Sequence, residues 1–145
     1  MQRILVGVDA SERAPGVLQR AISFARGTDA RLFIVRAVRV PIEFPIEALS
    51  MVPASLPAQL IAITQAGLDR FVQDVPPALV ERAEARIGTP WQVLCDTALE
   101  INADLVIIGS HGYGMIDRLL GTTAARVVNH APCSVLVVRD ADPKK

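Results

Sequence analysis

Five short strand-like segments recur along the chain, and helix-forming stretches separate each from the next. These segments cover residues 3–9, 32–38, 80–87, 104–108 and 134–138. Most of them are continuous apolar runs, which is typical of strands buried on both faces of a parallel sheet. The alternation therefore predicts an α/β fold, an open five-stranded parallel sheet with helices on both faces. A chain of 145 residues fits one domain, which we expect over residues 1–140 with a frayed tail at 141–145.

The segment between the first two strands has apolar residues at helical spacing from Ala14 to Ala25. Ser11 stands where a side chain can cap this helix, and Gly27 is a plausible stop signal. We therefore expect the first helix to lie between these two residues.

Three more helices are expected between the later strands. One covers residues 58–75 and ends at Pro76-Pro77, since proline interrupts a helix. Another starts after Thr89, which is followed by proline at the first turn. The last runs from about Leu119 to His130.

Two segments depart from the pattern of a buried strand or helix. Charged side chains alternate through residues 80–87, which favours a strand at the edge of the sheet. Residues 39–57 contain four prolines and are predicted to form a long loop, of the kind that often serves as a lid or a binding loop.

The charge balance excludes several classes of function. The chain has 15 basic and 15 acidic side chains and few aromatic residues, so it lacks the positive surface and the stacking platforms of nucleic-acid-binding proteins.

No apolar run approaches the ~20 residues of a membrane span. A strand begins almost at the N-terminus, without a signal peptide, so we expect a cytoplasmic protein. Cys95 and Cys133 are interpreted as small buried residues, with a regulatory disulfide as the alternative.

A glycine-rich segment follows the fourth predicted strand. Gly109 and Gly112 come directly after the strand, and Gly121, Thr122 and Thr123 open the last helix. Glycines let the backbone approach an anion closely, and the first N–H groups of a helix have no partner within the helix. The spacing therefore predicts a phosphate site. It lacks the P-loop lysine and the G-x-G-x-x-G fingerprint, which argues against a P-loop enzyme or a nicotinamide dehydrogenase.

Asp9 ends the first predicted strand and has two interpretations. Its carboxylate could accept hydrogen bonds from an adenine amino group or a ribose. Alternatively, Asp9 and Ser11 together cap the first helix. If the first and fourth strands are neighbours, Asp9 and the glycine segment face one crevice and contact the same small molecule.

Taken together, these residues resemble the universal stress protein family over nearly the whole chain. The resemblance rests on Ile4 to Ser11, Ala103 to Gly112, Leu120 to Ala124 and Val128 to Val138. It implies a Rossmann-like or flavodoxin-like sheet of order 3-2-1-4-5. ATP-binding members carry Gly-x-x-Gly, nine residues, then Gly-Ser/Thr. This chain has a variant with eight residues between Gly112 and Gly121-Thr122.

The resemblance also implies roles for single residues. Asp9 and Ala37, or its neighbour Val38, correspond to adenine-contacting positions. Gly109 and Gly112 correspond to ribose and phosphate contacts, and Gly121, Thr122 and Thr123 to the phosphate-binding turn. Many members dimerise through the last strand, here Val135, Leu136, Val137 and Val138.

Three functions are consistent with this pattern. The first is an ATP-binding stress-response module, with Mg²⁺ or Mn²⁺ held through the phosphates, whose ligand-dependent conformation governs binding to an unidentified protein partner. The second is a slow ATP hydrolase, which lacks an evident water-activating base. The third is a dimeric interaction protein that binds no nucleotide.

Overall fold

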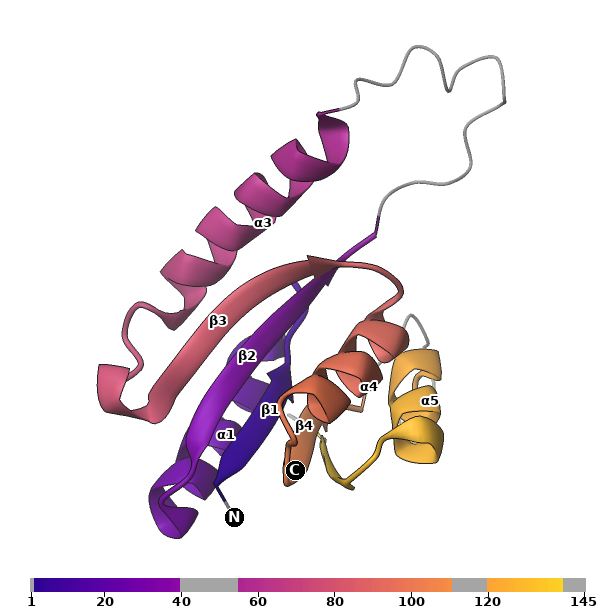
Figure 1. Cartoon of the computed structure of the whole chain (residues 1–145). Coiled ribbons are helices and arrows are strands. Elements are labelled where there is room, and N and C mark those ends of the chain that lie inside the picture. Colours follow the sequence, from indigo (N-terminus) through magenta and orange to yellow (C-terminus); the bar gives the residue numbers. More distant parts are fainter. Residues whose placement is uncertain (1, 40–54, 111–119, 140–145) are drawn as a thin grey trace, which may run out of the picture.

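The computed structural model describes residues 2–39, 55–110 and 120–139. Within these ranges, five strands form one parallel sheet (Figure 1). They are β1 (Arg3–Gly7), β2 (Arg31–Val38), β3 (Val80–Ile87), β4 (Leu105–Gly109) and β5 (Ser134–Val138). Their order is β3-β2-β1-β4-β5, so the predicted order 3-2-1-4-5 is confirmed.

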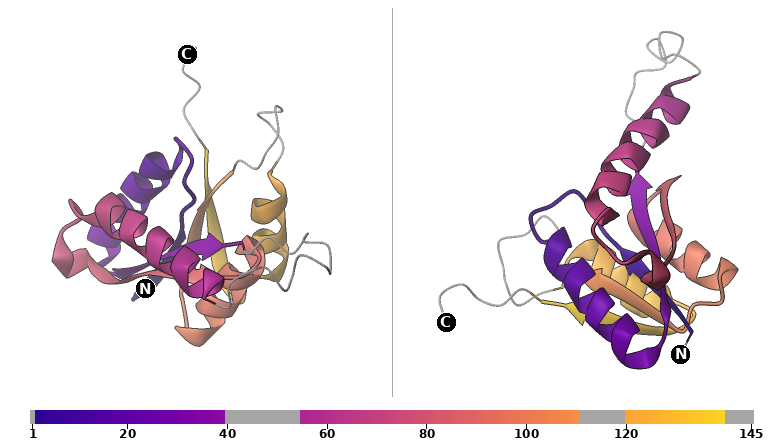
Figure 2. Two further views of the ribbon diagram at one scale, coloured as in Figure 1. Left: turned by 90° about the horizontal axis from the view of Figure 1, so that it is seen from above. Right: turned by 90° about the vertical axis from the view of Figure 1, so that its left-hand side faces the viewer.

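Helices cover both faces of the sheet. They are α1 (Ala14–Thr28), α3 (Leu56–Val72), α4 (Pro90–Glu100) and α5 (Thr122–His130), with a short 3-10 helix, η1 (Pro77–Leu79), before β3. The helices α1 and α3 pack on one face, and α4 and α5 pack on the other (Figure 2). The face changes because the chain runs outward from β1 to β3, then crosses to β4 and runs the other way, and crossovers between parallel strands are as a rule right-handed.

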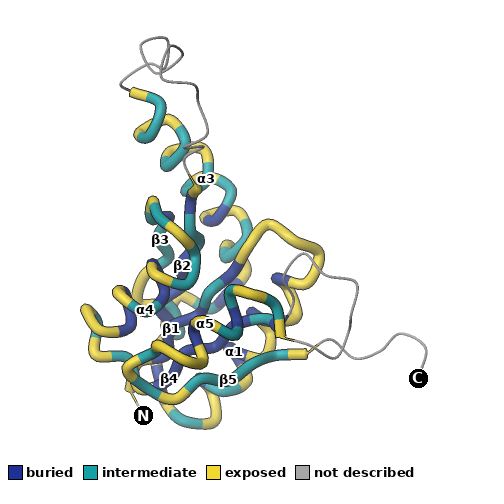
Figure 3. Tube along the Cα trace, turned by 90° about the vertical axis from the view of Figure 1, so that its right-hand side faces the viewer, coloured by how far each residue is buried: buried dark blue, intermediate teal, exposed yellow. Residues whose placement is uncertain are grey.

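The central strands supply most of the core, because their alternate side chains enter two separate clusters. Ile4, Val6 and Ile107 pack under α1 and α3, whereas Leu5 and Val106 pack under α4 and α5. All five side chains are fully buried. By contrast, Leu68 is the one fully buried residue of α3, and the N-terminal part of that helix projects past the sheet (Figure 3).

The end of α1 differs from the prediction. Gly27 was expected to stop the helix, but the helix continues through it to Thr28. The stop is Asp29, which adopts the left-handed conformation with φ of 55°. Its N–H and that of Ala30 both reach the carbonyl of Ala25, so the backbone turn ends the helix without a glycine.

The start of α1 also corrects two predictions. The first strand ends at Gly7 rather than at Asp9, and the N-cap position is Arg13 rather than Ser11. The Ser11 hydroxyl instead accepts a hydrogen bond from the Arg13 N–H at 3.3 Å. Ser11 therefore shapes the turn before the helix and does not cap it.

Three other boundaries shift as well. The helix predicted over residues 58–75 is α3, which begins at Leu56 with a proline in its first turn and ends at Val72, before Pro76 is reached. This start shortens the predicted loop 39–57, of which residues 40–54 lie outside the described ranges. The last helix begins at Thr122 rather than near Leu119. The predicted tail at 141–145 also lies outside the described residues.

Candidate functional site

The sheet reverses its direction of winding between β1 and β4, which pair in parallel with Val6 opposite Ile107. Asp9 follows the end of β1 and Gly109 is the last residue of β4, so both stand at the carboxyl edge of the sheet. In open α/β sheets this is the place where ligands bind. The condition set by the sequence, that the first and fourth strands are neighbours, is therefore met.

Backbone hydrogen bonds join the two ends of the glycine segment. The Gly121 N–H donates to the Ser110 carbonyl at 2.8 Å, and the Ser110 N–H donates to the Val138 carbonyl at 3.0 Å. The start of α5 is thereby fixed to the ends of β4 and β5. Gly112 lies outside the described residues.

The N-terminus of α5 presents backbone donors and hydroxyl groups. Gly121 is the N-cap, and the first intrahelical bond runs from the Ala125 N–H to the Gly121 carbonyl at 2.9 Å. The N–H groups of Thr122 and Thr123 precede that bond, and Thr122 is exposed. A helix N-terminus of this kind attracts anions through its dipole and its unpaired N–H groups.

Ser110 is a candidate site residue that the sequence analysis did not single out. It is only 1% exposed, and its hydroxyl has no hydrogen-bond partner in the described part of the chain. A buried polar group without a partner is unfavourable, so a ligand oxygen that accepts this hydrogen bond would stabilise the loop. The available signal was its position between Gly109 and Gly112, directly after a buried strand.

Gly109 has a packing role in this structure. A Cβ atom at this position would lie 3.3 Å from Cγ2 of Val17, so glycine lets the end of β4 approach α1 closely.

The Asp9 carboxylate is bound to its own loop. Its Oδ1 accepts hydrogen bonds from the Ser11 N–H at 2.9 Å and from the Ser11 hydroxyl at 2.5 Å. This is an Asx turn, which positions the carboxylate before α1. Because the N-cap of α1 is Arg13, Asp9 does not cap the helix itself, and that alternative is corrected.

Ala37 and Val38 end β2. Ala37 is half-buried against the cluster under α4 and α5, and Val38 is buried. The Val38 carbonyl accepts a hydrogen bond from Gly88 N–H at 3.0 Å, which closes the turn after β3.

A pocket of about 380 Å³ opens beside Asp9, between the loop after β1, the end of β2 and α3. Among the described residues of the predicted site, Asp9 is the one that lines it. Arg36, Arg70 and Phe71 also line it and were not predicted. The signal for Arg36 was a charged residue inside an otherwise apolar strand.

The described residues hold no group of three or more His, Cys, Asp or Glu side chains that could bind a metal ion. Cys95 and Cys133 are unpaired and half-buried. Burial raises the pKa of both thiols, so both stay protonated near neutral pH and are poor nucleophiles. No helix within residues 2–39, 55–110 and 120–139 combines the length and apolar character needed to cross a membrane.

The chain matches known proteins along nearly its whole length. The model of the universal stress protein family matches residues 1–139. A Staphylococcus aureus (strain USA300) protein named as a universal stress protein is 30% identical over 142 residues, which cover 95% of this chain and 84% of that protein.

Solved structures agree with this match. UspA from Lactobacillus plantarum is 27% identical, with a TM-score of 0.75 over 95% of this chain and 97% of its own. A universal stress protein crystallised in complex with cAMP is 25% identical, with a TM-score of 0.68 over 97% of this chain and 98% of its own.

Proposed function

Because this chain belongs to the universal stress protein family, we propose that it binds an adenine nucleotide, ATP, and acts in the stress response through that ligand. The observation that carries the proposal is the fixed start of α5. The hydrogen bond from Gly121 to Ser110 holds the helix N-terminus at the edge of the sheet where Asp9 also stands. This arrangement suits a ligand with an anionic end and a hydrogen-bonding base.

In the proposed complex, the N-terminus of α5 binds the phosphates. Thr122 and Thr123 supply backbone N–H groups and hydroxyls, and Gly121 has no side chain to block their approach. Gly109 and Gly112 contact the ribose and phosphates. The buried Ser110 hydroxyl fits this ligand, because it lacks a partner in the described part of the chain.

At the other end of the ligand, Asp9, Ala37 and Val38 contact the adenine. The Asp9 carboxylate accepts hydrogen bonds, and Ser11 already occupies its Oδ1, so the other oxygen meets the base. An accompanying Mg²⁺ or Mn²⁺ is held through the phosphates, which are its preferred oxygen ligands.

The relative crystallised with cAMP supports an adenine nucleotide as the ligand class. We further propose that the protein works in the cytoplasm as a homodimer paired through β5. Nucleotide binding then changes the surface that the dimer offers to a protein partner. The apolar character of β5 supports the dimer, since an exposed edge of this kind favours pairing.

The test is a Gly121→Val variant. Gly121 has φ of −61° and ψ of 161°, which valine adopts without strain, so the substitution fills the phosphate site and leaves the backbone as it is. We expect ATP affinity, measured by calorimetry, to fall by about tenfold to 100-fold. Nucleotide released from the denatured purified protein, measured by anion-exchange chromatography, should fall in parallel.

The matched control is Gly27→Val, because a Cβ at Gly27 would meet nothing within 4 Å. It makes the same substitution on the surface of α1 and should keep ATP affinity unchanged. Equal affinities in Gly121→Val and in the unaltered protein would contradict the proposed phosphate site.

A further inference from the structure

The pocket beside Asp9 lies on the face of the sheet covered by α1 and α3. The loop after β1, the first turn of α1, the end of β2 and the C-terminal part of α3 surround it. Its lining residues are Asp9, Ala10, Ser11, Ala14, Pro15, Arg36, Gly67, Arg70 and Phe71. The residues proposed to bind the nucleotide phosphates, Gly121, Thr122 and Thr123, belong to a helix on the opposite face.

Arg36 is held in this pocket with part of its hydrogen-bonding capacity unused. Its Nη2 donates to the Asp9 carbonyl at 3.1 Å, and its guanidinium lies 5.5 Å from the centre of the Phe71 ring. Its Nε is buried and has no partner among the described residues. Burial lowers the pKa of Arg36 and the nearby Asp9 opposes this change, so the guanidinium is a partly desolvated cation.

Arg70 brings a second cation to the same place. A Cβ atom on Gly67 would lie 3.7 Å from Arg36 Nη1 and 4.0 Å from Arg70 Nη2, so both guanidinium groups converge at this glycine. Glycine is unfavourable in the middle of a helix, and here it leaves the space between the two cations open.

The charges of the pocket do not balance. Neither Arg36 nor Arg70 forms an ion pair within residues 2–39, 55–110 and 120–139. Asp9 is the one acidic side chain that lines the pocket, and Ser11 holds its Oδ1. Two cations against one carboxylate leave an excess positive charge beside an unpaired donor.

We propose that Arg36 and Arg70 form a binding site for a phosphate group, distinct from the glycine segment. Guanidinium groups match the oxygens of a phosphate with paired N–H donors, and two of them on one group give strong charge-assisted hydrogen bonds. The phosphate comes either from inorganic phosphate or from a nucleotide that carries a second phosphate outside its 5′ chain, which ATP lacks. The site goes beyond the proposed ATP function and does not require it.

The direct test is a titration of the full-length protein with inorganic phosphate at constant ionic strength. The arginine Nε–H resonances are followed by NMR, and we expect saturable shifts for Arg36 and Arg70. In Arg70→Met, phosphate affinity should fall by about tenfold, the usual effect of losing a hydrogen bond to a charged group. Arg70→Lys should restore part of it, because lysine keeps the charge but not the fork of donors.

The matched control is Arg20→Met, which removes one positive charge from an exposed position on α1. An equal loss in both methionine variants would overturn the proposal, since it would show a general charge effect. Arg70 is exposed, so its substitution is not expected to affect folding.

A second arm separates the two sources of phosphate. Adenosine 3′,5′-bisphosphate and AMP are compared by calorimetry in the unaltered protein and in Arg70→Met. A preference for the bisphosphate that Arg70→Met removes assigns the site to a nucleotide phosphate. Saturable binding of inorganic phosphate without that preference assigns it to the free ion, and the absence of both overturns the proposal. In Gly121→Val, inorganic phosphate should still bind, so failure of the nucleotide site is recognised separately.

Discussion

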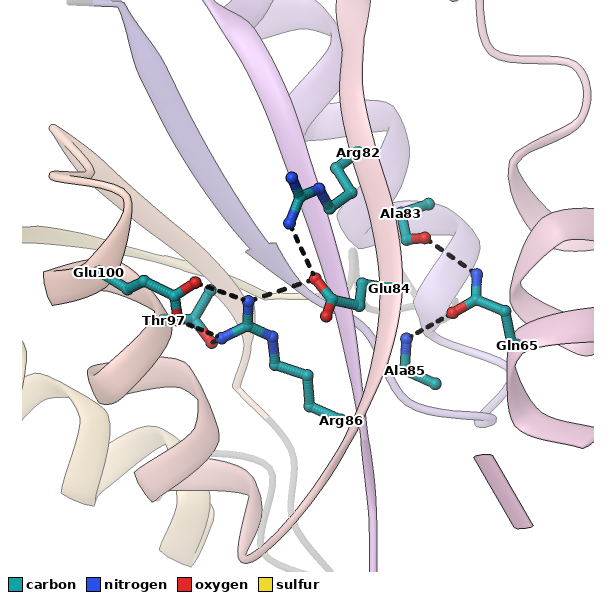
Figure 4. Close-up of polar contacts among 8 residues, drawn as sticks. All are labelled: Gln65, Arg82, Ala83, Glu84, Ala85, Arg86, Thr97 and Glu100. Atoms are coloured by element: carbon teal, nitrogen blue, oxygen red, sulfur yellow. Dashed lines mark hydrogen bonds and ion pairs between the residues drawn. The ribbon is translucent and has the colours of Figure 1, made fainter. Parts of the chain in front are cut away.

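The two edges of the sheet, β3 and β5, differ in whether the outward-facing N–H and carbonyl groups of the backbone have hydrogen-bond partners within the chain. Along β3, a glutamine from α3 reaches the edge: Gln65 Nε2 donates to the Ala83 carbonyl at 2.9 Å, and Gln65 Oε1 accepts from the Ala85 N–H at 2.8 Å (Figure 4). The side-chain amide thus bonds as a neighbouring strand would. Since these groups are satisfied within the chain, they are unavailable to another edge.

Charges add to the protection of β3. Arg86 forms an ion pair with Glu100 of α4 at 2.7 Å and another with Glu84 at 3.2 Å, and it also bonds the Thr97 hydroxyl (Figure 4). The prediction that the charged segment 80–87 is an edge strand is confirmed. Charged edges resist pairing with a second copy, because pairing would bury those charges.

Among the described residues, the β5 edge has neither a side-chain amide bonded to its backbone nor charged side chains on the strand. Its four valine and leucine side chains are all partly exposed (Figure 3). The Val138 carbonyl faces β4, where it accepts a hydrogen bond from the Ser110 N–H. Because the backbone groups of successive residues in a strand point to opposite sides, the N–H and carbonyl of Val137 point outward. The comparison teaches that one sheet can have one closed edge and one edge open to a partner.

The largest expected effect comes from removing an outward donor on β5. Val137→Pro eliminates that N–H, and proline is tolerated at a sheet edge, so the monomer should fold. Across a two-fold axis each copy loses a donor, and we expect the dissociation constant of the proposed dimer to rise by about 100-fold or more. Sedimentation equilibrium measures it.

The matched control for that variant is Ala83→Pro, which removes an outward N–H from the other edge. The Ala83 carbonyl bonds Gln65, so its N–H also faces outward. Dimerisation unchanged by Val137→Pro, or lost equally in both variants, would contradict pairing through β5.

A smaller effect is expected from opening the β3 edge. Gln65→Met keeps the length of the side chain but leaves Ala83 and Ala85 without their side-chain partners, so the free energy of unfolding in urea should fall by about 2 kcal/mol. Concentration-dependent association should also appear. Gln65→Glu keeps the acceptor for Ala85 but replaces the donor with a carboxylate oxygen that faces the Ala83 carbonyl and Asp69 Oδ1, which Gln65 Nε2 bonds at 2.9 Å each, so a loss at least as large is expected. Stability equal to that of the unaltered protein in both variants would show that water replaces the amide fully.

The smallest effect concerns the ion pair between Arg86 and Glu100. The hydrogen bond from Arg86 lowers the pKa of Glu100 below its ordinary value of 4.5. The folded state therefore binds this proton less readily than the unfolded chain, so the carboxylate stabilises the protein above pH 4.5 and this contribution disappears as the pH falls below it. Glu100→Gln should lower stability slightly at pH 7, and by progressively less as the pH falls below 4.5.

Urea unfolding of both proteins across this pH range measures the difference. Other carboxylates, such as Asp104, titrate in the same window, because backbone N–H groups of Arg3 and Gln2 lower its pKa. These carboxylates are present in both proteins, so their contributions to the free energy of unfolding cancel in the comparison. Because exposed ion pairs are screened, 1 M salt should reduce the difference, and a difference that persists in salt would point to packing instead.

Much of the fold could be predicted from local patterns. The apolar runs at residues 32–38 and 134–138 match β2 and β5 closely, and Pro90 correctly marks the start of α4. The predicted stop at Gly27 was wrong, because a glycine signal is one of several ways to end a helix and Asp29 provides another. The order of the strands came from the family resemblance rather than from periodicity, which carries no information on neighbours.

The candidate site likewise has parts that could be predicted from the sequence and parts that could not. The glycines around β4 and the threonines of α5 were visible in the sequence, because their spacing is short and their chemistry is local. The pocket formed with Arg36, Gly67 and Arg70 was not visible, since β2 and α3 supply its cations from positions more than 30 residues apart. The hydrogen bonds from Gln65 to the edge of β3 could not be predicted from the sequence either.

The sequence by itself determined which segments become strands and helices, and where the glycine segment lies between them. These properties follow from burial and backbone freedom, which act on neighbouring residues. Only the tertiary structure decided that Arg36 and Arg70 both lie beside Gly67, that Ser110 is buried, and that β3 is closed while β5 is open. Each of these depends on contacts between distant parts of the chain, which form only when the sheet and its helices pack together.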